Sequence, residues 1–191
     1  RRQQGKDDRE YEIKFVLNDS EAMTDLGSSI HEKDFLNSSN ERKFIIAIAD
    51  TRLRRRLFLT AVESGAEPYD IKSSSSEILE PSIIGPGSIL CGNSTVSCDT
   101  RIGTGFHLNI SAYLAHDCRV GDFVTMGPNS VCAGNVILED EVFVGAGALI
   151  RQGTVDNPLI IGSGTTIGLG AVVTKSVGSG AVIIGNPARA I

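Results

Sequence analysis

The chain has 191 residues with a formal net charge of −5, and 41% of its residues are hydrophobic. This length can bury the core of one or two domains, while the acidic balance argues against non-specific binding of nucleic acid. No apolar run approaches the ~18 residues that a membrane span requires. The charge-rich residues 1–10 lack the apolar core of a signal peptide, so we expect a cytoplasmic protein.

Composition changes near residue 80. Residues 1–80 hold 29 of the 41 charged residues but only three of the 21 glycines. The charged part is typical of an α/β domain, and the glycine-rich part is typical of a repetitive β-structure. We therefore expect one domain over residues 1–76, with a serine linker at 73–76, and a second domain over 77–191.

The first domain should contain strands at 11–17 and 44–49 and a helix from about Thr51 to Ser64. Asp50 is a suitable N-cap and Gly65 a suitable stop, and the expected buried helix positions are Leu53, Leu57, Phe58, Ala61 and Val62. Ligands of open α/β sheets lie beyond the carboxyl ends of the strands. This rule makes candidates of four residues: Asn18, Asp19, Ala49 and Asp50. The alternative is that Asp19 and Asp50 are only turn and cap residues.

No glycine-rich phosphate turn precedes the first expected strand. We therefore expect a small Rossmann-like domain that lacks its first βα segment, either because the chain is a fragment or because that half of the fold is missing.

From residue 84 onward, every sixth residue is apolar through twelve consecutive hexads: Ile84, Leu90, Val96, Ile102, Leu108, Leu114, Val120, Met126, Cys132, Leu138, Val144 and Ile150. A period of six predicts a β-solenoid, a parallel β-helix in which three hexads form a coil and residues 18 apart stack at about 4.8 Å. Glycines at the second hexad position, such as Gly85 and Gly103, suit tight corners. Five extra residues, 156–160, interrupt the register and predict a loop at one corner.

The four cysteines, at positions 91, 98, 118 and 132, show no metal-ligand spacing. Cys118 and Cys132 occupy inward hexad positions, so we interpret them as small core residues in a reducing compartment.

His116 and Gly134 are 18 residues apart and should stack on neighbouring coils. An imidazole beside a residue without a side chain leaves room for a substrate group and exposes a backbone N–H, as acyl transfer needs. Asp117 can orient the imidazole only if the two residues lie at a corner, because neighbours on a strand point to opposite faces. The alternative is a surface histidine without a catalytic role.

Three segments carry a resemblance to a known family: AHDCRVGDF at 115–123, CAGN at 132–135 and GNPAR at 185–189. They resemble the left-handed β-helix (hexapeptide-repeat) acetyltransferases, and within them the UDP-4-amino-sugar N-acetyltransferases and sialic acid O-acetyltransferases. The resemblance extends over nearly the whole chain. It implies a cytoplasmic homotrimer of cell-surface polysaccharide synthesis, with acetyl-CoA as co-substrate, no metal and active sites between subunits.

Residue roles follow from the same resemblance. His116 would be the general base, Asp117 would increase its basicity, and the Gly134 amide would donate to the thioester oxygen. The implied cofactor-binding residues are Thr125, Ala146, Leu169, Gly185, Asn186 and Pro187. Their positive charge adds Lys175 and Arg189 as candidates for binding the phosphates of the cofactor. Thr125 stands where some relatives have a second histidine, so its contact with the cofactor should differ. Asn109 joins Asn18, Asp19, Ala49 and Asp50 as an implied substrate-binding residue.

The sequence thus predicts direct acetyl transfer from acetyl-CoA to the amine of a nucleotide-linked amino sugar. Two alternatives stay open. The first is O-acetylation of sialic acid or a related sugar by the same machinery. The second is a β-helix that serves only as an assembly module without catalysis.

Overall fold

The protein is described by a computed structural model in which residues 12–17 and 28–191 are defined. The chain divides into two compact units, Arg1–Glu41 and Arg42–Ile191, and each is described by itself. The second unit contains part of the expected α/β region together with all of the hexads.

The first unit contains two parallel strands and a short helix. Strand β1 (Phe15–Leu17) pairs with β2 (Ser29–His31), and helix α1 (Glu32–Leu36) follows directly. The expected strand at 11–17 is thus confirmed for its last three residues. Asn18 and Asp19 lie outside the described residues.

The second unit opens with a βαβ arrangement. Strands β3 (Lys43–Phe44) and β4 (Glu67–Pro68) are parallel, and helix α2 (Thr51–Glu63) connects them. Asp50 caps the helix, because its Oδ1 accepts a hydrogen bond from the Leu53 N–H at 2.9 Å. Gly65 follows with a φ of +82°, a conformation that favours glycine. The expected helix, cap and stop are confirmed.

The strand expected at 44–49 is wrong beyond Phe44. The Nη1 of Arg54 donates to the carbonyls of Ile48 and Ala49, at 2.7 and 3.3 Å, so these groups bind a side chain and not a neighbouring strand. The buried face of α2 also differs from the expected one. Phe58 and Ala61 are buried, but Val62 is 42% exposed, and the charged Arg54 is among the buried residues.

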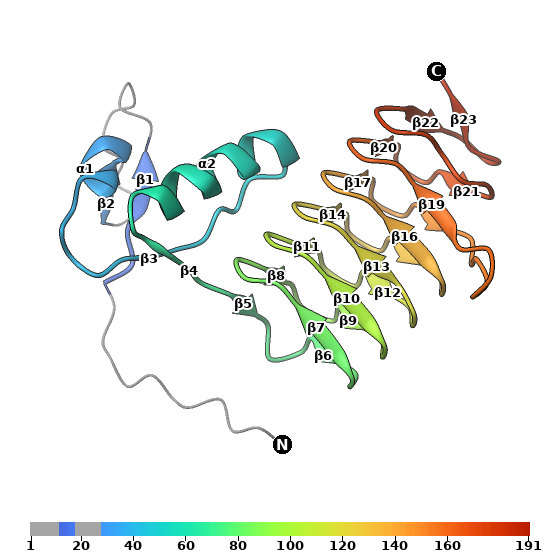
Figure 1. Cartoon of the computed structure of the whole chain (residues 1–191), viewed down its shortest axis with the longest axis horizontal. Coiled ribbons are helices and arrows are strands. Elements are labelled where there is room, and N and C mark those ends of the chain that lie inside the picture. The colour runs from blue at the N-terminus through green and yellow to red at the C-terminus, as the bar shows by residue number, and fades with distance from the viewer. Residues whose placement is uncertain (1–11, 18–27) are drawn as a thin grey trace. The chain divides into compact units, whose positions relative to one another are not determined.

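The rest of the second unit is a parallel β-helix of three sheets, seen as stacked coils in Figure 1. Sheet 1 consists of β7 (Ser82–Ile84), β10 (Thr100–Ile102), β13 (Arg119–Val120), β16 (Val136–Leu138) and β19 (Leu159–Ile161). Sheet 2 consists of β5 (Ile71–Lys72), β8 (Ile89–Leu90), β11 (His107–Leu108), β14 (Thr125–Met126), β17 (Phe143–Val144), β20 (Thr166–Ile167), β22 (Val182–Ile184) and β23 (Arg189–Ala190). Sheet 3 consists of β6 (Glu77–Ile78), β9 (Thr95–Val96), β12 (Tyr113–Leu114), β15 (Val131–Cys132), β18 (Leu149–Ile150) and β21 (Val172–Val173). The expected linker at 73–76 is a turn between β5 and β6.

The hexad residues form one continuous core. Every predicted inward residue from Leu90 to Ile150 is at most 5% exposed, and Ile84 packs against the same cluster. Up to the inserted residues, strand partners are 18 residues apart, as in the pairs of Thr100 with Ser82 and of Thr125 with His107. The predicted fold class, mainly β with parallel coils, is confirmed.

The second-position glycines lie at tight corners, as predicted. Second-position glycines do not have a positive φ: they permit close approach, since a Cβ on Gly85 would lie 2.6 Å from the carbonyl carbon of Gly103. The left-handed turn falls two residues later in each hexad, where the chain tolerates many residue types: Asn93, Asp99, Gly105, Ser111, Asp117, Phe123, Asn129, Asn135 and Glu141. Each of these corners binds the preceding coil, as the Asp117 N–H does by donating to the Cys98 carbonyl.

The extra residues lie slightly earlier than predicted. The Gly153 N–H donates to the Gly134 carbonyl and the Leu159 N–H donates to the Asn135 carbonyl, so the five inserted residues are 154–158. Leu159 and Ile160 belong to β19, where they pair with β16. The loop therefore emerges beside Gly134.

The four cysteines are free, and Cys118 and Cys132 are fully buried, which confirms their interpretation as core residues.

Among the described residues, no group of three or more His, Cys, Asp or Glu side chains is arranged to hold a metal ion. None of the helices in the described part of the chain has the length and apolar character needed to cross a bilayer. The cytoplasmic location stays a prediction.

Candidate active site

His116 lies at the corner between sheets 3 and 1, between β12 and β13. The next residue, Asp117, has a φ of +57°, and this turn brings two neighbouring side chains to the same side. The Nδ1 of His116 lies 2.7 Å from the Oδ2 of Asp117, and both side chains are about half exposed. Because a carboxylate only accepts hydrogen bonds, Nδ1 carries the proton of the neutral imidazole, and Nε2 is left with a free lone pair.

Gly134 stacks on His116, as the spacing of 18 predicts. The Asn135 N–H donates to the His116 carbonyl at 3.2 Å, and a Cβ on Gly134 would lie 2.7 Å from the Cε1 and 2.9 Å from the Nε2 of His116. The imidazole thus occupies the space that a side chain at 134 would need. Within the described chain the Gly134 N–H makes no backbone hydrogen bond, so it is available as a donor.

A second row of residues follows the corner between sheets 2 and 3. This row consists of Ile110, Pro128 and Ala146 on successive coils. Their carbonyls accept hydrogen bonds from the Asn129, Gly147 and Gly170 N–H groups of the following coil. The bond from Gly170 stacks the preceding residue, Leu169, on Ala146, and Leu169 is 78% exposed. The corner therefore brings together the two implied cofactor residues Ala146 and Leu169, and Asn109 lies beside them with its Nδ2 donating to the Met126 carbonyl.

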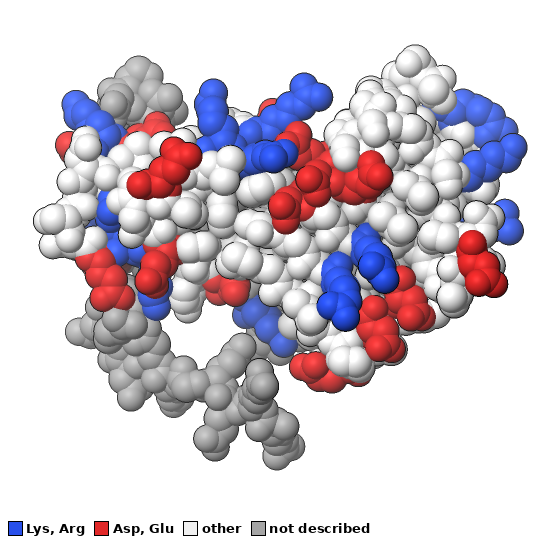
Figure 2. Space-filling model, in the orientation of Figure 1, with Lys and Arg blue, Asp and Glu red and all other residues white. Residues whose placement is uncertain are grey.

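The last coil brings together two basic residues implied in cofactor binding. Strand β23 folds back antiparallel on β22 after Gly185, whose φ is +89°. Lys175 and Arg189 then line a cavity of about 340 Å³, with Ile183 and Ala188 among its apolar walls. Figure 2 shows basic side chains gathered at this C-terminal end of the β-helix. Two cations over an apolar floor fit the phosphate and adenine groups of coenzyme A.

The structure does not bring all candidate residues together within one chain. The His116 corner and the Ala146 row lie at opposite edges of sheet 3. Thr125 is only 2% exposed, and its hydroxyl accepts a hydrogen bond from Arg54 at 2.9 Å. Ala49 and Asp50 lie at the start of α2 and belong neither to the His116 corner nor to the Ala146 row.

Arg54 is a buried residue that sequence reasoning missed. Its Nε donates to the Gly105 carbonyl at 3.1 Å and its Nη2 to the Phe123 carbonyl at 2.6 Å. Together with the bonds to Ile48 and Ala49, these contacts fasten the start of α2 to the β-helix. Burial lowers the pKa of Arg54 to about 10, so the guanidinium is still charged at neutral pH. The apolar pattern of the helix assigned Arg54 to the exposed polar face, so nothing in the sequence indicated that it is buried.

His107 lies beside Arg54 under the same helix. Burial lowers the pKa of His107 to about 4, with a further contribution from the positive charge of Arg54, while a hydrogen bond with the backbone of Ile46 opposes the change. Its Nε2 is buried and lacks a hydrogen-bond partner among the described residues. The imidazole is therefore neutral and structural at physiological pH.

The lowered pKa of His107 predicts that the free energy of unfolding decreases in acid. The unfolded chain binds the proton near pH 6.5 and the folded chain only near pH 4, so the stabilisation is complete above pH 6.5 and is lost as pH falls toward 4. The difference corresponds to about 3 kcal/mol in the free energy of unfolding. Urea denaturation at pH 7, 5.5 and 4.5 measures it. The His107→Asn variant should lose most of this pH dependence, and an unchanged slope in the variant would contradict the assignment.

Comparison with known proteins places these features in context. No family model matches the chain. A GDP-perosamine N-acetyltransferase of Escherichia coli O157:H7 is 46% identical over 149 residues, which cover 78% of this chain and 67% of that protein. The structure of WeeI from Acinetobacter baumannii AYE is similar with a TM-score of 0.88 and 39% identity, over 93% of this chain and 84% of WeeI. PerB from Caulobacter crescentus, in complex with CoA and GDP-perosamine, has a TM-score of 0.81 and 27% identity, over 87% of this chain and 80% of PerB.

Proposed function

This chain belongs to the left-handed β-helix sugar N-acetyltransferases of the hexapeptide-repeat type, and from this membership we propose that it acetylates the amine of a GDP-linked amino sugar related to perosamine. It is an acyltransferase with acetyl-CoA as the acetyl donor, so the alternative of a non-catalytic assembly module is wrong. The observation that carries the proposal is the His116–Asp117 pair stacked on Gly134. The names of the relatives support transfer to nitrogen over transfer to a hydroxyl.

The geometry supports a direct transfer. The Nε2 of His116 removes a proton from the attacking amine as its nitrogen forms a bond to the thioester carbonyl carbon. The Gly134 N–H donates to the oxygen, which becomes negatively charged in the tetrahedral intermediate. The carbon–sulfur bond then breaks, and the imidazolium returns its proton to the thiolate of coenzyme A. Asp117 stabilises the imidazolium by accepting the hydrogen bond from Nδ1.

We propose that the transfer proceeds without a covalent acyl-enzyme. Cys118 and Cys132 are fully buried, and the hydrogen bond with Cys118 together with burial raises the pKa of Cys132. A protonated, inaccessible thiol is a poor nucleophile. Cys98 is partly exposed and stacks on His116 from the preceding coil, since the Asp117 N–H donates to its carbonyl. The proposed reaction uses a base and an oxyanion donor and none of these thiols.

We also propose that the active site forms between subunits of a trimer. The outward row of sheet 3 is apolar over four coils, from Tyr113 through Val131 and Leu149 to Val172, and Tyr113 and Leu149 are 38% and 45% exposed. Packing three copies through this row sets the Ala146 corner of one copy against the His116 corner of the next. Such packing buries apolar surface and unites the two rows that one chain keeps apart.

We propose that the α/β region binds the nucleotide part of the substrate. Support comes from each unit by itself: β1 and β2 pair in parallel in the first, and β3, α2 and β4 form a βαβ arrangement in the second. Ala49 and Asp50, at the start of α2, keep their proposed substrate role. Asn18 and Asp19, outside the described residues, keep theirs as predictions. The implied cofactor residues of the C-terminal turn, Asn186 and Pro187, are proposed to close over acetyl-CoA beside the Lys175–Arg189 cavity.

The test is an acetyl-transfer screen across GDP-, UDP- and dTDP-linked amino sugars and free sialic acid. We expect acetylation of the GDP-linked amine, and acetylation of sialic acid alone would overturn the proposed substrate class.

Binding of acetyl-CoA is tested separately by thermal unfolding. A ligand at 100 times its Kd stabilises the folded state by about 2.7 kcal/mol, so millimolar acetyl-CoA should raise the Tm by several degrees. The Lys175→Gln/Arg189→Gln double variant should show a smaller rise, while Arg56→Gln, an exposed residue of α2, serves as the control. An equal rise in all three proteins would contradict the role of the Lys175–Arg189 cavity.

A further inference from the structure

The outward row of sheet 1 contains two stacked arginines. Strand pairing places Ile83, Arg101, Arg119 and Ile137 at equivalent positions on successive coils. Arg101 and Arg119 are direct partners, so their backbones are about 4.8 Å apart. Like charges placed directly opposite each other destabilise a sheet. Neither guanidinium forms an ion pair or hydrogen bond within the described part of the chain, so the repulsion is not offset there.

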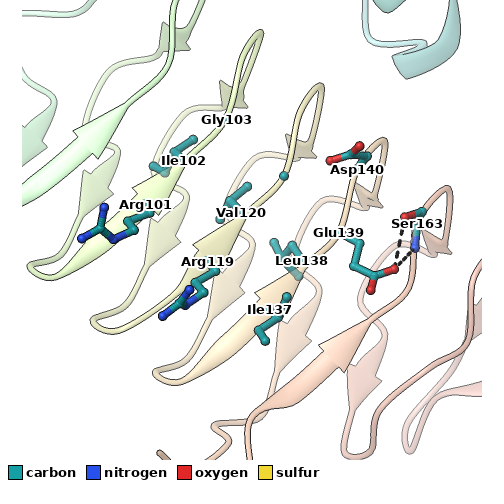
Figure 3. A pocket seen from close by; sticks show the side chains of 11 residues that line it. Arg101, Ile102, Gly103, Arg119, Val120, Ile137, Leu138, Glu139, Asp140 and Ser163 are labelled. Atoms are coloured by element: carbon teal, nitrogen blue, oxygen red, sulfur yellow. Dashed lines mark hydrogen bonds between the residues drawn. The ribbon is translucent and has the colours of Figure 1, made fainter.

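Both arginines line a hollow of about 600 Å³ on this sheet (Figure 3). Glu139 and Asp140 lie at its other rim, where their carboxylates accept hydrogen bonds from backbone N–H groups and not from the arginines. The Glu139 Oε2 accepts from the Ser163 N–H at 2.8 Å, and the Asp140 Oδ1 accepts from the Asp122 N–H at 2.9 Å. In Figure 3 the two arginine side chains lie next to each other and away from these carboxylates. The hollow thus has a cationic side that lacks an anion.

The cationic side begins at the His116 corner. Arg119 is the third residue after His116 on the same coil, so their Cα atoms are at most about 10 Å apart. A substrate that places its amine at the Nε2 of His116 can therefore extend over sheet 1 toward Arg119 and Arg101. In a nucleotide-linked sugar, the diphosphate is attached to the anomeric carbon of the sugar and joins it to the nucleoside. Guanidinium groups bind phosphate oxygens through paired, charge-assisted hydrogen bonds.

We propose that Arg101 and Arg119 bind the diphosphate of the sugar nucleotide whose amine reacts at His116. This inference rests on the proposed function and adds to it a phosphate subsite on the β-helix itself. Two stacked cations match two successive phosphates, and the bound diphosphate removes the repulsion between them. The proposed ligand accounts for two adjacent positive charges that no side chain of the described residues neutralises.

The test uses the 191-residue chain and three variants of it: Arg101→Gln, Arg119→Gln and the double variant. Each single change should raise the KM for the sugar nucleotide by about tenfold, and the double change by about 100-fold, as expected for loss of charge-assisted hydrogen bonds. The KM for acetyl-CoA should stay within about twofold of the wild-type value. Titration calorimetry with GDP should show the same order of affinities. Arg56→Gln, which also removes an exposed arginine, should behave as wild type.

An unchanged KM and GDP affinity in the double variant would overturn the phosphate subsite. A change in oligomeric state on gel filtration with unchanged GDP affinity would also overturn it, because the arginines would then serve contacts between copies. Failure of the proposed function gives a different result: the wild type would acetylate none of the sugar nucleotides. The GDP titration would still test the two arginines in that case.

Discussion

Replacement of His116 by alanine is expected to lower kcat by roughly 10²–10⁴-fold, the usual contribution of a general base. The imidazole is the titratable group that faces Gly134, and Asp117 holds its Nδ1 so that Nε2 is free to accept a proton. The side chain is 54% exposed, so its removal leaves no buried cavity and the fold should persist. Steady-state acetyl transfer, with the Tm rise on acetyl-CoA as a check of cofactor binding, measures the effect.

The Asp117→Asn variant removes the negative charge of this side chain while nearly keeping its shape. Asparagine tolerates the positive φ at this corner, so the backbone should be retained while the carboxylate is lost. We expect a decrease in kcat that is smaller than for His116→Ala, with unchanged thermal stability. Near-normal turnover in His116→Ala would exclude the proposed mechanism, whatever the result for Asp117→Asn.

The Gly134→Ala variant is expected to lose roughly 10²–10³-fold in kcat, comparable to the loss of an oxyanion donor. The new methyl group would lie 2.7 Å from the Cε1 of His116, so the imidazole must turn away from its present position. Because the ring is half exposed and can turn toward solvent once its bond to Asp117 is broken, the cost falls on catalysis more than on folding.

Gly178→Ala is the matched control for this substitution. It adds the same methyl group to the β-helix at a position where nothing lies within 4 Å and where φ is not positive. It should therefore keep both kcat and Tm close to the wild-type values. Equal turnover of Gly134→Ala and Gly178→Ala would show that the His116–Gly134 stack has no part in the reaction.

Much of the fold was predictable because its rule is local and repeated. One buried side chain in every six residues, from Leu90 to Ile150, specifies the coil, and the multiple of 18 specifies which residues stack. The same count places Gly134 on His116 from their positions in the chain alone. The helix limits were also predictable, because Asp50 and Gly65 act on the backbone groups next to them.

Other features depended on contacts between distant segments. The strand expected at 44–49 did not form beyond Phe44, because Arg54 takes two of its carbonyls and itself reaches Gly105 and Phe123. The spacing of apolar residues assigns Arg54 to the exposed face of the helix. In the structure it is buried, because four carbonyls and the Thr125 hydroxyl accept its hydrogen bonds. The inserted loop was displaced by two residues because hydrogen bonds at both of its ends, not residue type, determine where it leaves the coil.

By itself the sequence determined the coil, its register and the stacking of His116 on Gly134, because a periodic pattern of burial fixes position along and around a β-helix. The tertiary structure alone decided that Asp117 faces His116, since a left-handed backbone turn, adopted here by many residue types, sets the direction of that side chain. It alone also decided that Arg101 and Arg119, which the register stacks, have no partner anion among the described residues, because neutralisation of a charge depends on every segment that packs nearby.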